Sequence, residues 1–178
     1  GLNIARGAHA VDESVVKTEI NAKGNAVMKL ESLARMNGFA SEGAHSALFD
    51  AELTVKVLGL IKKNQPHTWD TFLRTANRTD TETIFKKEKI FTLAEYHFGK
   101  NYRYLVAPLH PKHCIHPIYQ WGQAVDLKID PVPLLEMSVS ELKSAIKKLK
   151  FLRTIRSNKA PIILDASFGL QVEPYSNI

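Results

Sequence analysis

Hydrophobic positions in the first part of the chain recur at the three- and four-residue spacing of helices. Between residues 46 and 63 this pattern is unbroken and ends in two lysines, so we predict the longest helix there. Shorter helices are expected over residues 29–36, which an Asn-Gly pair follows, and over residues 68–78. Residues 1–28 show no sustained period, which favours a loop or a severed connection.

The pattern changes to short β-rich runs between residues 84 and 127. Turn residues separate four such runs, at residues 90–96, 102–107, 114–121 and 124–127. Short strands joined by hairpins suggest a small barrel or sandwich. A capping box that begins at Ser138 predicts a basic amphipathic helix to about Arg153, and residues 160–164 are expected to form a last buried strand. The two patterns predict an α+β chain with a boundary near Pro66.

The net charge of +6 comes entirely from the second part of the chain. Residues 1–70 hold eight of the 24 Lys and Arg and eight of the 18 Asp and Glu, so residues 71–178 hold sixteen against ten. A basic surface suits a polyanion such as nucleic acid, because each cation placed at a phosphate releases condensed counterions. An ordinary solvated surface is the alternative, since many domains are mildly basic.

The sequence shows no membrane or secretion signal. No stretch approaches the roughly 20 apolar residues of a spanning helix, and residues 1–7 lack the apolar core of a signal peptide. The single cysteine, Cys114, excludes an internal disulfide and agrees with a reducing compartment. We therefore expect a cytoplasmic protein without a membrane partner.

A histidine lies five positions before an aspartate at the start of the long predicted helix. His45 lies in a loop of small residues, where it can face a reacting water as a general base. Asp50 falls in the first helical turn, and its oxygens suit a hard cation. The pattern is common by chance, and taken alone it favours the alternative of a dipole-stabilised Asp on an ordinary helix. A catalytic pair of Mg²⁺ ions needs further carboxylates.

The residues around this pair, and several later segments in the same order, resemble one known family. The LESLARMNG segment at 30–38 and the KKNQP segment at 62–66 resemble the surroundings of the third motif of DEDD-type 3′→5′ exonucleases, in their histidine variant. More narrowly, they resemble the exodeoxyribonuclease I family. The later matches are LVAPLHP at 105–111, VDL at 125–127, DPVPLLEM at 130–137 and the Asn-Lys-x-Pro segment within 156–162. Together the matches span roughly residues 28–165, far more than a six-residue pattern.

The resemblance implies a fold and an activity. Residues 1–66 would be the C-terminal helices of an RNase H-like exonuclease domain, and residues 67–178 an SH3-like DNA-binding barrel with a flanking helix. The implied activity is hydrolysis of single-stranded DNA from its 3′ end to nucleoside monophosphates, with two Mg²⁺ ions held by four acidic residues. His45 would match the general base and Asp50 the last acidic metal ligand.

Residues 1–44 depart from the family because its first two acidic motifs are not found there. Asp12 and Glu13 are adjacent, so along a strand their side chains would point to opposite faces, and they lie too close to His45. With three of four metal ligands missing, we expect a C-terminal piece of a longer, monomeric protein, inactive alone, rather than a naturally short relative. The alternative function is a non-catalytic module that binds single-stranded DNA or the acidic tail of single-stranded-DNA-binding protein.

The missing part of the nuclease domain raises the question of what covers the remaining helices. The apolar faces at Leu30/Leu33 and at Leu53/Val57/Leu60 would need a cover in place of a central sheet. We expect these faces to dock onto the barrel domain or to self-associate.

Candidate DNA-contacting residues are Lys100, Arg103, Tyr104, Lys147 and Lys148. Bases of a single strand could stack on aromatic side chains of the β-rich part, or these side chains could pack in the core, where about half are expected to be buried. The aromatic residues are Tyr96, Phe98, Tyr102, Tyr104, Tyr119 and Trp121. For the two lysines of the predicted helix, a solvated helix face is the somewhat favoured alternative.

The acidic tail of single-stranded-DNA-binding protein is expected to bind basic residues of the second domain, with no residue assigned. The ligand-type residues His110, His113, Cys114 and His116 match no familiar zinc spacing, and a turn followed by a strand is the favoured interpretation.

Overall fold

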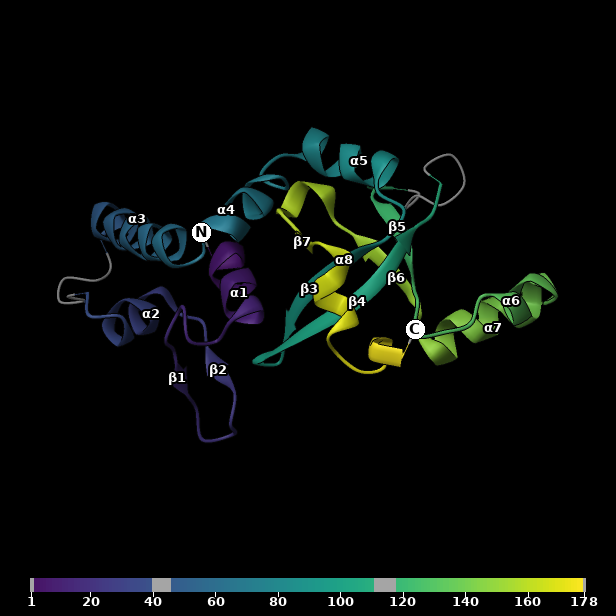
Figure 1. The fold of residues 1–178 in the computed structure, drawn as a ribbon, viewed down its shortest axis with the longest axis horizontal. Coiled ribbons are helices and arrows are strands. Elements are labelled where there is room, and N and C mark those ends of the chain that lie inside the picture. The colour runs from purple at the N-terminus through teal and green to yellow at the C-terminus, as the bar shows by residue number, and fades with distance from the viewer. Residues whose placement is uncertain (1, 40–45, 111–117, 178) are drawn as a thin grey trace. The chain divides into compact units, whose positions relative to one another are not determined.

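The computed structural model describes residues 2–39, 46–110 and 118–177 of the chain (Figure 1). These residues form two compact units. The first comprises the residues up to Arg74 together with Ala94–Tyr102, and the second comprises Thr75–Leu93 and Arg103 onward. The predicted α+β class is confirmed, because helices and an antiparallel sheet account for the described residues.

The first unit is mainly helical. The long helix α3 packs against α1, α2 and α4, and Gly24, with a φ of 74°, lies in the turn between the two short antiparallel strands. The elements are α1 (Leu2–Val11), β1 (Glu19–Ile20), β2 (Ala26–Val27), α2 (Leu30–Met36), α3 (Ala47–Asn64) and α4 (Pro66–Leu73). The predicted helices over 29–36 and 46–63 are confirmed.

Helix α1 overturns one expectation. Residues 2–11 are helical rather than a loop, and they bury Ala5, Ala8 and Ala10. Because α1 and α2 both pack on α3, Leu33, Leu53 and Val57 are buried within this unit. Packing among these helices therefore covers the three positions, while docking onto the second unit and self-association stay predictions. The helix escaped prediction because its buried residues are mostly alanine and glycine, which give a weak hydrophobic period.

The second unit contains most of a five-stranded sheet, whose strands have the order β6-β5-β4-β3-β7. Val106 of β4 pairs with Asp126 of β5, and Gly122 of β5 pairs with Ile155 of β6. The elements are α5 (Arg78–Lys87), β3 (Phe91–His97), β4 (Lys100–Pro108), β5 (Gly122–Asp126), α6 (Val132–Leu135), α7 (Val139–Leu149), β6 (Leu152–Ile155), β7 (Ile162–Leu164) and α8 (Ala166–Leu170).

The core of this unit lies between α5 and the sheet. Phe85 of α5 meets Phe91 of β3 edge to face, with ring centroids 5.8 Å apart. Buried strand residues complete the cluster, namely Leu93, Val106, Ala124, Ile155 and Ile163. Gly122 permits this packing, because a Cβ there would lie 2.7 Å from the Phe85 ring.

Several predicted boundaries need correction. Among the described residues, strands β3 to β7 form one open sheet with β6 and β7 at its edges, so the SH3-like barrel is not seen. The helix expected over residues 68–78 corresponds to α4, which already ends at Leu73, and the next helix, α5, begins at Arg78. Of the strand expected over residues 114–121, residues 114–117 lie outside the described residues, and residues 118–121 form a turn and irregular backbone rather than a strand. Helix α7 ends at Leu149, because Lys150 adopts the left-handed conformation and Arg153 already lies on β6.

None of the helices among the described residues combines the length and the apolar character needed to cross a bilayer.

Candidate nucleic-acid interface

Asp50 lies in the first turn of α3 with its side chain exposed. The helix begins at Ser46, whose hydroxyl accepts a hydrogen bond from the Phe49 N–H at 3.2 Å, while the Asp50 N–H donates to the Ser46 carbonyl at 3.0 Å. These bonds fix the backbone at Asp50 and leave its carboxylate accessible. The predicted base, His45, lies outside the described residues.

The residues that the structure describes do not fit a two-metal site. No three of their His, Cys, Asp or Glu side chains come together as a group that could hold a metal ion. Asp50 would supply one carboxylate, and a pair of Mg²⁺ ions needs several. Of the His- and Cys-rich run, His110 is described and exposed, whereas His113, Cys114 and His116 lie outside the described residues.

Three predicted DNA-binding residues lie on β4, and two of them have partners within the protein. Nη1 of Arg103 donates to the Phe168 carbonyl at 3.5 Å. The guanidinium of Arg153 lies 3.6 Å from the centroid of the Tyr104 ring, which also packs against the core. Lys100 is exposed at the start of the strand. These contacts give Arg103 and Tyr104 structural roles, and their contact with DNA stays a prediction.

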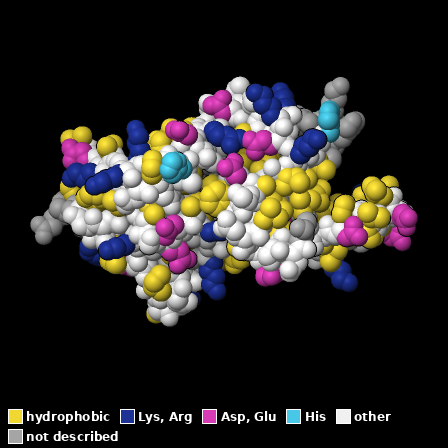
Figure 2. All heavy atoms as spheres, viewed as in Figure 1, with side chains coloured by type: hydrophobic (Ala, Val, Ile, Leu, Met, Phe, Trp, Pro, Cys, Tyr) yellow, Lys and Arg dark blue, Asp and Glu magenta, His cyan; other side chains and the backbone are white. Residues whose placement is uncertain are grey.

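The remaining predicted cations, Lys147 and Lys148, are exposed in the last turn of α7. In the last turn the two positive charges interact favourably with the helix dipole, and they are equally accessible to a phosphate group. Figure 2 shows further Lys and Arg side chains where α5 lies, and Arg78, Lys86 and Lys87 of that helix are exposed. The cations of α5 were not among the predicted contacts.

The six candidate aromatic residues are all described, and each is at least partly exposed, from half-buried Tyr96 to Phe98 at 93%. The expectation that about half would be buried is wrong. The hydrophobic core is filled mainly by aliphatic strand residues and by Phe85 and Phe91, so the tyrosines and Trp121 remain at its margin.

Two of these aromatic side chains form a stacked pair in the second unit. The rings of Tyr119 and Trp121 are 4.3 Å apart at 17°, and Arg156 lies 5.3 Å from the centroid of the Trp121 ring. The indole N–H of Trp121 donates to Oδ1 of Asn158 at 3.0 Å. The sequence indicated the aromatics but not Arg156 or Asn158, which lie more than thirty residues further along the chain.

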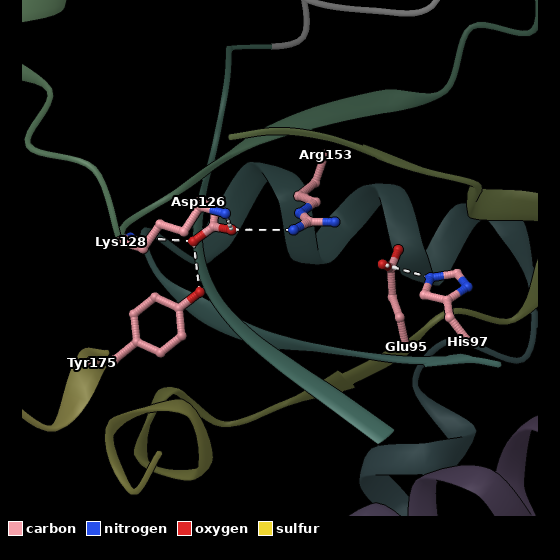
Figure 3. Close-up of polar contacts among 6 residues, drawn as sticks. All are labelled: Glu95, His97, Asp126, Lys128, Arg153 and Tyr175. Atoms are coloured by element: carbon pink, nitrogen blue, oxygen red, sulfur yellow. Dashed lines mark hydrogen bonds and ion pairs between the residues drawn. The ribbon is translucent and has the colours of Figure 1, made fainter. Parts of the chain in front are cut away.

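A buried polar cluster holds the C-terminal segment to β5 (Figure 3). Asp126 is 0% exposed, and its Oδ1 accepts from the Tyr175 hydroxyl at 2.6 Å. Its Oδ2 lies 3.3 Å from Nη2 of Arg153 and 3.5 Å from Nζ of Lys128. Burial, and then the bond to Asp126, raises the pKa of Tyr175 well above its ordinary value. Asp126 is enclosed by partners, so we assign it a structural role.

A separate contact in the same figure joins Glu95 and His97 at the end of β3, with His97 Nε2 3.0 Å from a Glu95 carboxylate oxygen. Both side chains belong to the first unit. This pair is on the surface, and a surface pair of this kind contributes little to stability.

Comparison with known proteins identifies the relationship. No protein-family model matches the chain. Exodeoxyribonuclease I of Haemophilus influenzae is 28% identical over 181 residues, which cover 93% of this chain and 37% of that protein. The chain is homologous to a segment of exodeoxyribonuclease I. It spans little more than a third of the length of such relatives.

Solved structures of exonuclease I share the fold. The Escherichia coli enzyme in complex with a dA16 oligonucleotide matches 97% of this chain and 38% of its own, with a TM-score of 0.71 and 24% identity. The ExoI/SSB-Ct complex matches 99% of this chain and 39% of its own, with a TM-score of 0.69 and 24% identity. The shared fold therefore extends over both units of this chain.

Proposed function

We propose that this chain is part of a 3′→5′ exodeoxyribonuclease that hydrolyses single-stranded DNA to nucleoside monophosphates. The observation that carries this proposal is the similarity to exodeoxyribonuclease I along 93% of the chain. In this assignment residues 1–66 belong to the exonuclease domain and residues 67–178 to the DNA-binding domain.

In the complete enzyme, Asp50 would be one acidic ligand of the two Mg²⁺ ions and His45 the general base. The ions would stabilise negative charge on the reacting phosphate. The described part of this chain offers one suitable carboxylate at the start of α3, so the other ligands come from elsewhere in the enzyme. We therefore propose that the chain does not cleave DNA by itself.

Binding of the DNA strand is the part of this function that the chain can perform alone. Its excess of cations lies in residues 71–178, and the Tyr119–Trp121 pair with Arg156 offers rings on which bases can stack. Lys147 and Lys148 are proposed to contact phosphates.

A second candidate function is a non-catalytic module that binds single-stranded DNA or the acidic tail of single-stranded-DNA-binding protein. The fold shared with the ExoI/SSB-Ct complex favours it. An acidic tail would use Arg and Lys side chains around an apolar pocket.

The test combines cleavage and binding. The chain is incubated with Mg²⁺ and single-stranded DNA labelled so that release of 3′-terminal nucleotides is measured, and binding of the same DNA is titrated at two salt concentrations. We expect no release, together with binding that weakens steeply with salt, because counterions are released from the strand. Cleavage abolished by Asp50→Ala would show a complete metal site in this chain, and absence of binding at low salt would contradict the DNA-binding role.

A further inference from the structure

A small pocket opens in the second unit between α5 and the turn that precedes β5. Its volume is about 250 Å³, below the range of pockets that enclose drug-sized ligands. Phe85, Leu109 and Gly122 supply apolar walls, and Gln120 and Ser157 supply polar groups. The pocket therefore suits a single ring system or side chain rather than an extended ligand.

Ser157 gives this pocket an unused hydrogen-bonding group. The residue is 2% exposed, and among the described residues its hydroxyl has no hydrogen-bond partner. A buried hydroxyl without a partner destabilises a fold, so such a group calls for an explanation. A ligand that carries both polar edge atoms and a flat apolar face would satisfy the hydroxyl and fill the pocket.

The pocket and the aromatic stack are built from the same two chain segments. Gln120, with a φ of 54°, lies between the stacked Tyr119 and Trp121 in the chain and lines the pocket. Ser157 likewise lies between two residues that contact Trp121. The guanidinium of Arg156 lies over the Trp121 ring, and the side chain of Asn158 accepts a hydrogen bond from the Trp121 indole N–H. Tyr119 is 54% exposed, so its ring is accessible to a ligand that also reaches the pocket.

Charge at the pocket favours a ligand with phosphate groups. Arg78 and Lys86 of α5 line it, together with Glu82, whose carboxylate pairs with Arg78 at 2.5 Å. With Arg156 nearby, the cations outnumber the one carboxylate. An apolar peptide side chain would leave the Ser157 hydroxyl unpaired, whereas a nucleobase presents hydrogen-bonding groups at its edge and a face that stacks on aromatics.

We infer that this pocket holds one unstacked base of a DNA single strand while a neighbouring base stacks on Tyr119. The inference rests on the proposed single-stranded DNA binding and names the place where that binding contacts a base. The side-chain amide of Gln120 and the hydroxyl of Ser157 meet the edge of the base, and Phe85 and Leu109 contact its face.

The test compares an oligothymidine with a strand of the same length in which every base is replaced by an abasic site. The full chain carries Trp69→Phe, so that Trp121 is its only tryptophan and reports binding by fluorescence. We expect the abasic strand to bind about tenfold more weakly, because base stacking and pocket contacts are lost. Ser157→Ala and the pocket-filling Leu109→Phe should weaken binding of the intact strand about three- to fivefold and leave the abasic strand unaffected.

Ser157→Ala removes an unpaired buried hydroxyl, so the variant should fold at least as well as the parent, which thermal unfolding checks. The matched control is Ser144→Ala on α7, which should leave both strands unaffected. Intact-strand binding that neither pocket variant changes would overturn the pocket and leave the DNA-binding function standing. Absence of binding by the parent chain at low salt would overturn both.

Discussion

At the scale of single residues, two aspartates show what the sequence could and could not reveal. Asp50 was predictable because its position, at the start of an amphipathic helix and after a histidine, can be followed along the chain. Asp126 was not recognised as buried, because its partner Tyr175 lies 49 residues away and no local pattern joins them. Long-range polar contacts of this kind depend on the tertiary fold, which periodicity does not specify.

Removing the Tyr175 hydroxyl should destabilise the second unit. Tyr175→Phe keeps the buried ring but deprives the enclosed Asp126 carboxylate of a hydrogen bond at 2.6 Å. Hydrogen bonds to charged groups contribute about 1.5–3 kcal/mol, so the free energy of unfolding measured in urea should fall by about that amount. Tyr102→Phe, at a more exposed position, is the control. An unchanged urea midpoint for Tyr175→Phe would mean that this hydrogen bond contributes nothing to stability.

The raised pKa of Tyr175 also predicts a loss of stability in alkali. In the unfolded chain this phenol ionises at its ordinary pKa, 10.0, whereas in the folded protein it stays protonated to higher pH. The folded state therefore binds more protons above pH 10, and the free energy of unfolding should decrease as the pH rises beyond that value. Tyr175→Phe should lose less stability than the parent between neutral pH and this alkaline range, as measured by urea unfolding at several pH values. An equal decrease of the free energy of unfolding with pH in both proteins would contradict the raised pKa of Tyr175.

At the scale of elements, the prediction succeeded where a helix carries large apolar residues and explicit end signals. Helix α3 was predictable from its period, and α7 from its capping box. Helix α1 was missed because it buries alanines, and α5 because its polar, threonine-rich sequence gives a weak helical signal. The open sheet was mistaken for a barrel, because alternating runs predict strands without specifying whether the sheet closes.

The capping box should determine how well α7 forms, since none of the residues of this helix is buried. Ser138 accepts a hydrogen bond from the Glu141 N–H, and the Glu141 carboxylate accepts from the Ser138 N–H at 2.8 Å. Ser138→Ala should therefore destabilise the helix by about 1 kcal/mol. Faster amide exchange in α7 would show this, with Ser144→Ala as a control within the same helix. Equal exchange rates in the two variants would contradict a capping role for Ser138.

At the scale of the whole molecule, we propose that this chain contributes DNA-binding surface and one catalytic carboxylate to a larger nuclease. Homology to exodeoxyribonuclease I covers nearly all of the chain but little more than a third of the relatives' length. The order of matching segments made this relation predictable from sequence, because ordered matches over more than a hundred residues are rarely coincidental. The geometry of a complete metal site was not predictable, because the sequence offers one carboxylate in the matching motif, whereas two ions need several.

The most direct test is a chimera in which this chain replaces the matching segment of Haemophilus influenzae exodeoxyribonuclease I. The account predicts a folded protein that releases nucleotides from the 3′ end of single-stranded DNA in the presence of Mg²⁺, and it predicts that Asp50→Asn in the chimera abolishes this release. A chimera that folds but has no activity, or whose activity is unaffected by Asp50→Asn, would contradict the proposed role of this chain.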